Sequence, residues 1–450
     1  MLKNKELLVM IGILAVGLIV NFGILLVYYT PLPKQLIGDE YHYFNYGLMV
    51  VSGQRVPYNL IWPPLYGEFI GLVFSVFGVR RIYIQIIQIG LWLASGILFS
   101  QIVKRLTSSH IMTYTSFALF LLCPELIAFS HYLWPEIMHL FMWILGLWLL
   151  ICYPQRRIAA IIAGIVFGLA LLTKSLLMPF IPVVVLFVLI IKRSTLSVKI
   201  RSSNAALLVV MIFLTILPVM VNNLITKGAF IIADSSIFNI WVGLNDSERT
   251  DHNANEIVLQ ELSEYMSSNL NYKMKNLKYI NKIVEKVEQQ GLFGTFFNQI
   301  GKQYFRLFDI QTFFTTQLPG GGRQAYTTKS QGLIKLLKLY SYIIYGFILV
   351  AGAAGICFLQ VRYVNWFHFF ALFIIYNLGL FLFLHVKTRY TIQFLPMLIF
   401  FASVTSYWLI SRIRKTEMLP LEGFVFNNFR VSCGILLGTL MSIIMVQSLI

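Results

Sequence analysis

The sequence predicts an all-α integral membrane protein with about eleven transmembrane helices and one large water-facing loop. Three observations support this fold class. Of the 450 residues, 58% are hydrophobic and only 12% are charged, which is too little charge to cover a soluble protein of this length. Apolar runs of roughly 20 residues, long enough to cross a bilayer, alternate with short charged connectors. The Lys and Arg residues gather in these connectors.

The net charge of +17 has an explanation in the membrane. In a soluble protein such an excess would suggest nucleic acid, but basic residues between hydrophobic runs are what the positive-inside rule expects. We therefore expect no nucleic-acid partner. The four cysteines lie in or beside apolar runs without paired spacing, so the sequence predicts neither a zinc site nor a disulfide framework.

Residues 7–29 form the first predicted span. A cleaved signal peptide would have a shorter apolar core and a small-residue cleavage site, so we expect a retained helix. The basic connectors place the N-terminus inside and the C-terminus outside. The ten further predicted spans are 82–103, 111–128, 137–152, 158–173, 176–191, 205–222, 338–359, 365–385, 390–410 and 431–449.

Two predicted outside segments are too long to be simple connectors. Residues 30–81 are rich in Tyr, Pro and acidic residues, and their apolar part at 65–78 is interrupted by Glu68. This part is predicted to be a helix at the membrane interface before the second span. The other segment, 223–337, is the one sizeable polar stretch and is predicted to form helices in water. The chain thus divides into an N-terminal transmembrane core that includes the first outside loop, an outside helical region and C-terminal transmembrane helices, at residues 1–222, 223–337 and 338–450.

Asp39 and Glu40 follow the first predicted span and lie among aromatic residues, near the expected depth of the lipid headgroups. A carboxylate there can act as a general base, because its negative charge suits taking a proton from an attacking hydroxyl. The simpler alternative is an acid in a solvated loop. Position alone leaves both interpretations open.

Residues 38–78 resemble the first outside loop of GT-C glycosyltransferases of the protein-mannosyltransferase and aminoarabinose-transferase type. These enzymes use a polyprenyl-phosphate-linked sugar as donor. Their pattern is an acidic pair, an aromatic residue, a glycine in a turn, and Pro-Pro-Leu before an apolar helix that ends at glycine. The matching residues are Asp39 and Glu40, Tyr43, Gly53, Pro63, Pro64 and Leu65, and Gly78.

Weaker resemblance to the same family continues in order along most of the chain. It includes the segments 133–147, 168–182, 222–245 and 388–396. The sequence departs from the family at Ile61, since the aminoarabinose-type members have an acidic residue two positions before the Pro-Pro pair. This difference argues against specificity for lipid A aminoarabinose.

The resemblance implies an inverting transfer in which Asp39 is the catalytic base and polyprenyl phosphate is the leaving group. The departing phosphate needs cations, because phosphate chemistry relies on positioning and electrostatics. Lys174 is a lone cation between two apolar runs, and Arg389 begins a predicted span on the outside. The alternatives are a lysine that snorkels to water and an ordinary interfacial anchor. His385 and Lys387, close to Arg389, are expected to take no part.

Glu136 and His139 are three positions apart on a predicted helix and therefore share a face. Together with Glu40 they would suit a divalent cation, Mg²⁺ or Mn²⁺, since carboxylates and imidazole are competent ligands. The alternative is that Glu136 caps the helix and His139 is a packed polar residue. By resemblance, Glu40, Tyr43 and Glu136 are candidates for substrate binding. No other cofactor is expected.

The leading prediction is a GT-C glycosyltransferase in the inner (plasma) membrane, surrounded by membrane lipids, with its active site on the extracytoplasmic side. It would transfer a hexose or pentose to a lipid, glycan or protein acceptor. The alternative is a transporter or flippase of lipid-linked sugars, which predicts charged residues along a central pathway and repeated halves. The predicted spans are nearly free of charge and show no repeat, which favours surface chemistry. A noncatalytic assembly subunit is a third class that the acid pair does not exclude.

Overall fold

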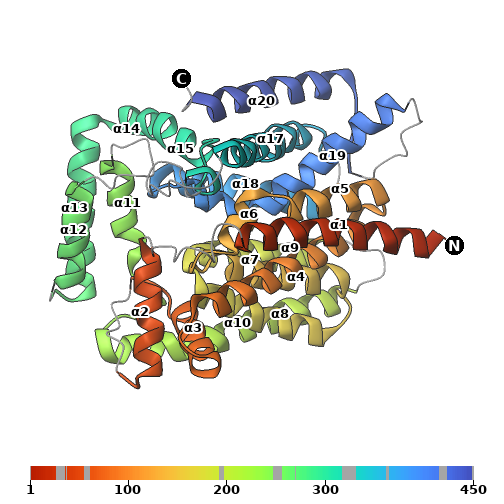
Figure 1. Ribbon diagram of the computed structural model, residues 1–450. Coiled ribbons are helices and arrows are strands. Elements are labelled where there is room, and N and C mark those ends of the chain that lie inside the picture. The colour runs from red at the N-terminus through yellow and green to blue at the C-terminus, as the bar shows by residue number, and fades with distance from the viewer. Residues whose placement is uncertain are drawn as a thin grey trace.

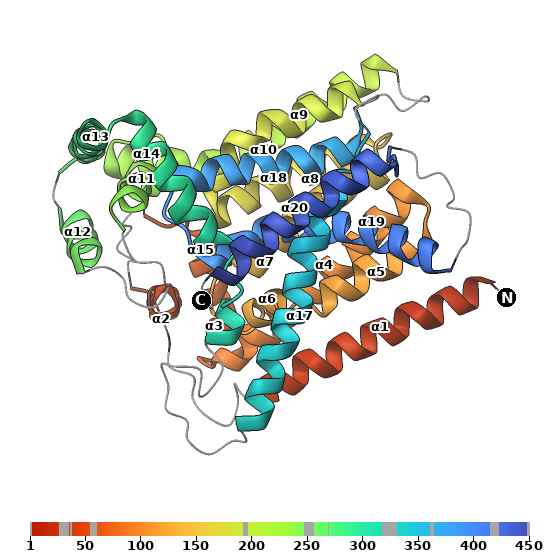
Figure 2. The ribbon, with the colours of Figure 1, turned by 90° about the horizontal axis from the view of Figure 1, so that it is seen from above.

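The computed structural model describes residues 2–26, 36, 38–54, 61–191, 197–246, 256–268, 270–316, 331–360, 364–414 and 423–447. Within these ranges the chain forms helices and no β-strand, which confirms the all-α fold class (Figure 1). The long helices run side by side, and the chain's N-terminus lies at the end of this bundle opposite helices α2 and α11–α13 (Figures 1 and 2).

Each of the eleven predicted spans coincides with an apolar helix or with two short consecutive helices. They are α1 (Leu2–Ile24), α4 (Arg81–Thr107), α5 (His110–Leu121) with α6 (Pro124–Phe129), α7 (Glu136–Cys152), α8 (Arg157–Thr173), η2 (Ser175–Phe180) with α9 (Ile181–Ile190), α10 (Val198–Lys227), α17 (Gln331–Ile356), α18 (Trp366–Phe383), α19 (Leu395–Ile413) and α20 (Asn428–Val446). Among the described residues, seven helices are long and apolar enough to cross a membrane alone, namely α1, α4, α10 and α17–α20. The others are shorter, so the number eleven stays a prediction.

Helix ends follow the local sequence. The predicted span 111–128 breaks before Pro124, because proline lacks an N–H and disfavours helical backbone in the residue before it. Asn365 caps α18 by accepting hydrogen bonds from two backbone amides, and His368 completes the capping box. Gly228 ends α10 with a φ of 67°, in the left-handed region that favours glycine.

Two glycines let α8 and α10 pack closely. Gly164 and Gly168 are four residues apart on one face of α8, the spacing typical of close helix contacts in membranes. A Cβ at Gly164 would lie 2.8 Å from the carbonyl oxygen of Leu208 in α10. A Cβ at Gly168 would lie 3.2 Å from the carbonyl oxygen of Ile212. Larger residues would therefore separate the two helices.

The segments that the sequence predicts to lie outside form further helices, and α2 and α11–α13 among them gather at one end of the bundle (Figure 1). The predicted boundaries after residues 222 and 337 fall inside α10 and α17, which continue across them. Lys278 joins α13 to Glu264 of α12 at 2.6 Å, and Lys282 of α13 also pairs with Glu261 of α12. The elements are α2 (Asp39–Val51), α3 (Leu65–Phe77), α11 (Ser235–Asn245), α12 (Glu256–Ser267), α13 (Tyr272–Gln290), α14 (Leu292–Gln299), η3 (Ile300–Tyr304), α15 (Phe305–Leu307), α16 (Phe313–Thr316) and η4 (Thr388–Gln393).

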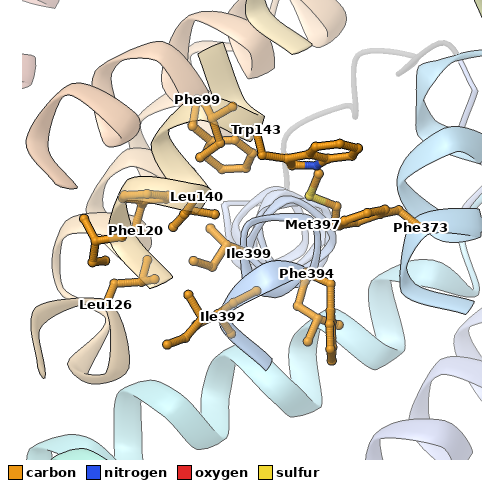
Figure 3. Packing of buried hydrophobic residues seen from close by; sticks show 14 of the residues in the cluster. Phe99, Phe120, Leu126, Leu140, Trp143, Phe373, Ile392, Phe394, Met397 and Ile399 are labelled. Atoms are coloured by element: carbon orange, nitrogen blue, oxygen red, sulfur yellow. The ribbon is translucent and has the colours of Figure 1, made fainter. Parts of the chain in front are cut away.

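The hydrophobic core surrounds α19, which buries more of its surface than any other candidate span in the described residues. Aromatic and aliphatic side chains of α4, α5, α7 and α18 pack around it (Figure 3). The rings of Trp143 and Phe373 stack with centroids 5.2 Å apart beside Met397 (Figure 3). Because η4 leads directly into α19, this packing fixes the position of η4 at the outer end of the core.

Candidate active site

A cavity of about 430 Å³ lies where α2, α7, α11, α12 and the segment before α19 meet. Its polar and charged lining is unusual for a chain with so few charges. The lining includes Asp39, His42, Tyr43, Glu136, Lys174, Asn239, Asp246, Arg306, His385, Lys387, Arg389 and Tyr390. Of the predicted site residues, the structure brings Asp39, Tyr43, Glu136, Lys174 and Arg389 together in this one cavity.

Asp39 is the first residue of α2 and lies against Arg389 of η4. The Nη2 atom of Arg389 donates a hydrogen bond of 2.9 Å to Oδ2 of Asp39. The guanidinium carbon lies 4.8 Å from the ring centroid of Trp134 and 5.2 Å from that of Tyr390. Stacking between two rings orients a planar guanidinium, so the fork of Arg389 is held facing the carboxylate.

The electrostatic surroundings keep Asp39 ionised. Burial alone would raise the pKa of its carboxyl group, but the positive charges of Arg389 and Lys387 hold that pKa below its ordinary value. The carboxylate still reaches solvent, since 30% of the Asp39 side chain is exposed against 14% of Arg389. An ionised and accessible carboxylate is the form that a general base requires.

Glu136 and Lys174 form a second ion pair in the cavity wall. Glu136 is the first residue of α7, and Lys174 lies between α8 and η2. The Nζ atom of Lys174 is 3.1 Å from Oε1 of Glu136, and their side chains are 11% and 3% exposed. The same ammonium lies 5.4 Å from the ring centroid of Tyr390. Both predicted phosphate-binding cations therefore meet a carboxylate in this structure.

The predicted metal ligands do not come together. Glu40 is fully buried outside the cavity lining, and its Oε1 accepts a hydrogen bond of 2.8 Å from the backbone amide of Leu133. His139 is 2% exposed and also lies outside the lining, while Glu136 faces Lys174. Within the described ranges no group of three His, Cys, Asp or Glu side chains is placed to hold a metal ion. Glu40, Glu136 and His139 are therefore not arranged as a metal site in the described part of the chain.

Tyr43 forms a supported aromatic wall. Its ring is 5% exposed and packs edge-on against Tyr66, with centroids 4.9 Å apart. The buried hydroxyl of Tyr66 in turn donates a hydrogen bond of 2.7 Å to Oε1 of Gln88 in α4. Trp62 and His42 extend the aromatic lining, with ring centroids 4.8 Å apart. Flat rings beside a polar cavity suit stacking against a sugar.

A third charged group was not singled out by the sequence. Asp246, at the end of α11, accepts a hydrogen bond of 3.2 Å from Nη1 of Arg306 and lies 3.0 Å from Nδ1 of His385. We call these three residues the Asp246 cluster. Arg306 and Asp246 are 5% and 9% exposed. Charges in a predicted water-facing region are usually solvated, so no sequence signal marked their burial.

The segment that leads into η4, together with the first turn of η4, brings three basic side chains into the cavity. His385, Lys387 and Arg389 alternate along it, and the backbone is extended at Lys387, with φ −136° and ψ 155°. Alternate residues of an extended segment point the same way. We expected His385 and Lys387 to take no part, but the structure places both in the lining.

The outer wall of the cavity is fixed at Gly243, in the last turn of α11. Its carbonyl oxygen accepts hydrogen bonds from Gln299 at 3.0 Å, Lys302 at 2.7 Å and Gln303 at 2.9 Å. The last carbonyls of a helix have no partner within it, so these donors complete the helix end. A Cβ at Gly243 would lie 2.6 Å from the carbonyl carbon of Leu384. Only glycine lets α11 approach this closely.

Ile61 explains the departure from the family pattern. The side chain is 5% exposed and packs with Phe238, Trp241 and Val242 of α11. Where the aminoarabinose-type enzymes have an acidic residue, this chain has an apolar contact between its first loop and its outside helices. A carboxylate at this position would lose these apolar contacts.

Comparison with known proteins gives one family match and one similar fold. Residues 62–221 match the family described as dolichyl-phosphate-mannose-protein mannosyltransferase. No curated protein shows a significant sequence match. The fold is similar to that of the Archaeoglobus fulgidus oligosaccharyltransferase in the apo form, with a TM-score of 0.52 and 11% identity over 98% of this chain and 54% of that chain.

A second structure of the archaeal enzyme is tethered by a disulfide bond to an acceptor peptide containing the NVT sequon. It superposes with a TM-score of 0.44 at 11% identity, over the same shares of the two chains. The present chain thus spans about half the length of the oligosaccharyltransferase that it matches. At this identity the likeness shows the fold, and the chemistry has to be argued from the cavity.

Proposed function

We propose that this chain is a glycosyltransferase of the GT-C type, which the family match over residues 62–221 and the shared fold support. It transfers a sugar from a polyprenyl-phosphate-linked donor to a hydroxyl of a lipid, glycan or protein acceptor, with inversion at the anomeric carbon. Asp39 is the general base. The observation that carries the proposal is an ionised, solvent-reaching carboxylate in a cavity that also holds several cations.

The reaction is a single displacement. As the acceptor oxygen attacks the anomeric carbon, its proton passes to Asp39 and the bond from that carbon to the phosphate oxygen breaks. The electron pair stays on the phosphate oxygen, so polyprenyl phosphate leaves with an added negative charge. Attack opposite the leaving phosphate inverts the configuration. Proton transfer to a positioned base typically contributes about 10²–10⁴ in rate.

Arg389 and Lys174 supply positive charge near the leaving group. Nη2 of Arg389 donates to Asp39 and to the hydroxyl of Tyr390, whereas Nη1 has no hydrogen-bond partner among the described residues and is not buried. Nη1 is therefore available to donate to a phosphate oxygen while Nη2 orients the base. Lys174 fixes Glu136 in the same wall.

The remaining predicted residues have different positions relative to the substrates. Tyr43 and Glu136 line the cavity and are proposed to contact the sugar. Glu40 lies behind the lining and holds the turn before α7 through the amide of Leu133. We therefore propose that Glu40 positions Glu136 rather than touching substrate.

The chain is a multi-pass membrane protein, and we propose that it resides in the inner (plasma) membrane with the cavity on the extracytoplasmic side. The basic connectors and the gathering of α2 and α11–α13 at the end opposite the N-terminus support this orientation (Figure 1). Cysteine introduced at Lys273 of α13 is expected to react with an impermeant maleimide in intact cells, whereas cysteine at Ser197 is not. The reverse labelling pattern would place the cavity inside.

The deciding experiment uses purified protein, a synthetic prenyl-phosphate sugar and a panel of lipid, glycan and peptide acceptors. We expect equal amounts of glycosylated acceptor and prenyl phosphate, with inverted configuration by NMR. A flippase would move the lipid across vesicles without forming a glycosidic bond. Transport without any transfer to a broad acceptor panel would reject the proposal.

A further inference from the structure

The cavity has more positive than negative charge. Among the described residues, its lining contains four Lys or Arg residues and three carboxylates. Each carboxylate already has a Lys or Arg partner within 3.2 Å. The cation that remains is Lys387, which has no carboxylate within 4 Å in the part of the chain that the structure describes. Counting Asp, Glu, Lys and Arg side chains alone, the described part of the lining therefore has one positive charge more than it has negative charges.

The side chain of Lys387 lines the cavity, so its positive charge acts there. Its backbone is extended, and its half-buried side chain lines the same cavity as Arg389. The charge acts on the base, since Lys387 is among the groups that lower the pKa of Asp39. Lys387 is therefore close enough to influence the reacting groups without being paired to them.

We propose that Lys387 is the residue that binds the phosphate of the donor. The inference rests on the proposed function and names the anion-binding group of that same site. A sugar phosphodiester carries one negative charge at neutral pH, which equals the unbalanced charge of the lining. Lys174 would have to leave the buried carboxylate of Glu136 unpaired in order to bind the phosphate fully, which is strongly unfavourable, and Arg389 would have to give up its hydrogen bond to the base Asp39. Lys387 has no such carboxylate partner among the described residues.

The position of Lys387 also suits the leaving polyprenyl phosphate. When the glycosidic bond breaks, the phosphodiester becomes a monoester, whose second ionisation has a pKa of about 6. Negative charge on the phosphate thus grows in the transition state. A cation held beside it stabilises the transition state more than the ground state. Loss of Lys387 should therefore lower kcat as well as weaken binding of the donor.

The same single negative charge could come from a different source, an acidic group on the acceptor. Two measurements separate the sources. The equilibrium Kd of a short-chain prenyl phosphate reports the phosphate site without turnover. The KM for acceptor at saturating donor reports the acceptor.

The variants are Lys387→Gln, Lys387→Arg and, as control, Lys273→Gln at an exposed lysine of α13 outside the cavity. A hydrogen bond to a charged group is worth enough that its loss should weaken prenyl-phosphate binding about tenfold in Lys387→Gln. Lys387→Arg should stay within about threefold of wild type, since it keeps the charge. Lys273→Gln should not change the Kd. Equal melting temperatures exclude misfolding.

Each result bears on the proposal. If wild type binds prenyl phosphate and Lys387→Gln binds it equally well, Lys387 is not the phosphate ligand and the donor class stands. If acceptor KM rises while the prenyl-phosphate Kd is unchanged, the anion belongs to the acceptor and the assignment is wrong. If wild type binds no prenyl phosphate, the donor class fails and the role of Lys387 fails with it.

Discussion

Two groups of ion pairs line the same cavity, and they differ in how much of their side chains is exposed. The pair of Asp39 and Arg389 is partly open, with 30% and 14% of the side chains exposed and one hydrogen bond of 2.9 Å. The Asp246 cluster is closed, because Asp246 and Arg306 are 9% and 5% exposed and two nitrogens of Arg306 face the carboxylate. An open pair can rearrange around a substrate. A closed pair keeps its partners, and here it joins the end of α11 to α15.

The largest effect should follow from removing the open carboxylate. Asp39→Asn keeps the shape of the side chain but cannot take the acceptor proton, so transfer should fall by about 10²–10⁴. The melting temperature in detergent and the binding of prenyl phosphate should change little, because Asp39 is partly exposed. Transfer by the Asn variant at near wild-type rate would exclude Asp39 as the base and leave Glu136 as the acid to test.

The closed cluster should respond in the opposite way. Arg306→Met leaves Asp246 buried without its guanidinium partner, which should lower the free energy of unfolding by about 3 kcal/mol. Thermal unfolding in detergent measures the loss. Arg389→Met is the matched control, and it should reduce activity with much less effect on melting. Equal melting temperatures for the two variants would remove the distinction between the pairs.

The pH profile of kcat/KM tests the open pair more finely. The pKa of Asp39 lies below its ordinary value of about 3.9, so the carboxylate stays ionised, and the rate should hold, until the pH falls below that value. Arg389→Gln removes a cation that holds this pKa down. Its acid limb should move up by about one pH unit, whatever the loss in absolute rate. An unchanged limb would show that another group titrates.

The smallest effect should come from chelation. Glu136 and Asp39 already face Lys174 and Arg389, so the cavity has no carboxylate ready to bind a divalent cation. Incubation with EDTA followed by a metal-free assay should change the rate less than about twofold. A loss restored by Mg²⁺ or Mn²⁺ would show that the pairs open to admit a metal.

The sequence predicted most of the helical core, because apolar runs of membrane length report directly on burial in lipid. It missed the break before Pro124, which a single residue imposes inside an otherwise uniform apolar run. It also could not give the number of crossing helices, since several apolar helices are too short to decide by length.

The candidate site was predictable where resemblance marked particular positions, as at Asp39, Lys174 and Arg389. It was not predictable where a role depends on contacts between distant segments. Glu40 lies next to Asp39 in the sequence but turns inward to the amide of Leu133. Asp246 and Arg306 are separated by 60 positions, and only the folding of the outside helices buries them together.

Gly243 has a further consequence for recognising this cavity in other sequences. Charged residues are poor markers, because an ion pair can be reversed or replaced by another pair of similar reach. The backbone contact at Gly243 has no such substitute, since any side chain there would meet the end of α18, and one carbonyl would lose three donors as the helices part. Another chain with the same cavity wall should therefore have a glycine two residues before the end of the helix that corresponds to α11. Its charged residues can differ.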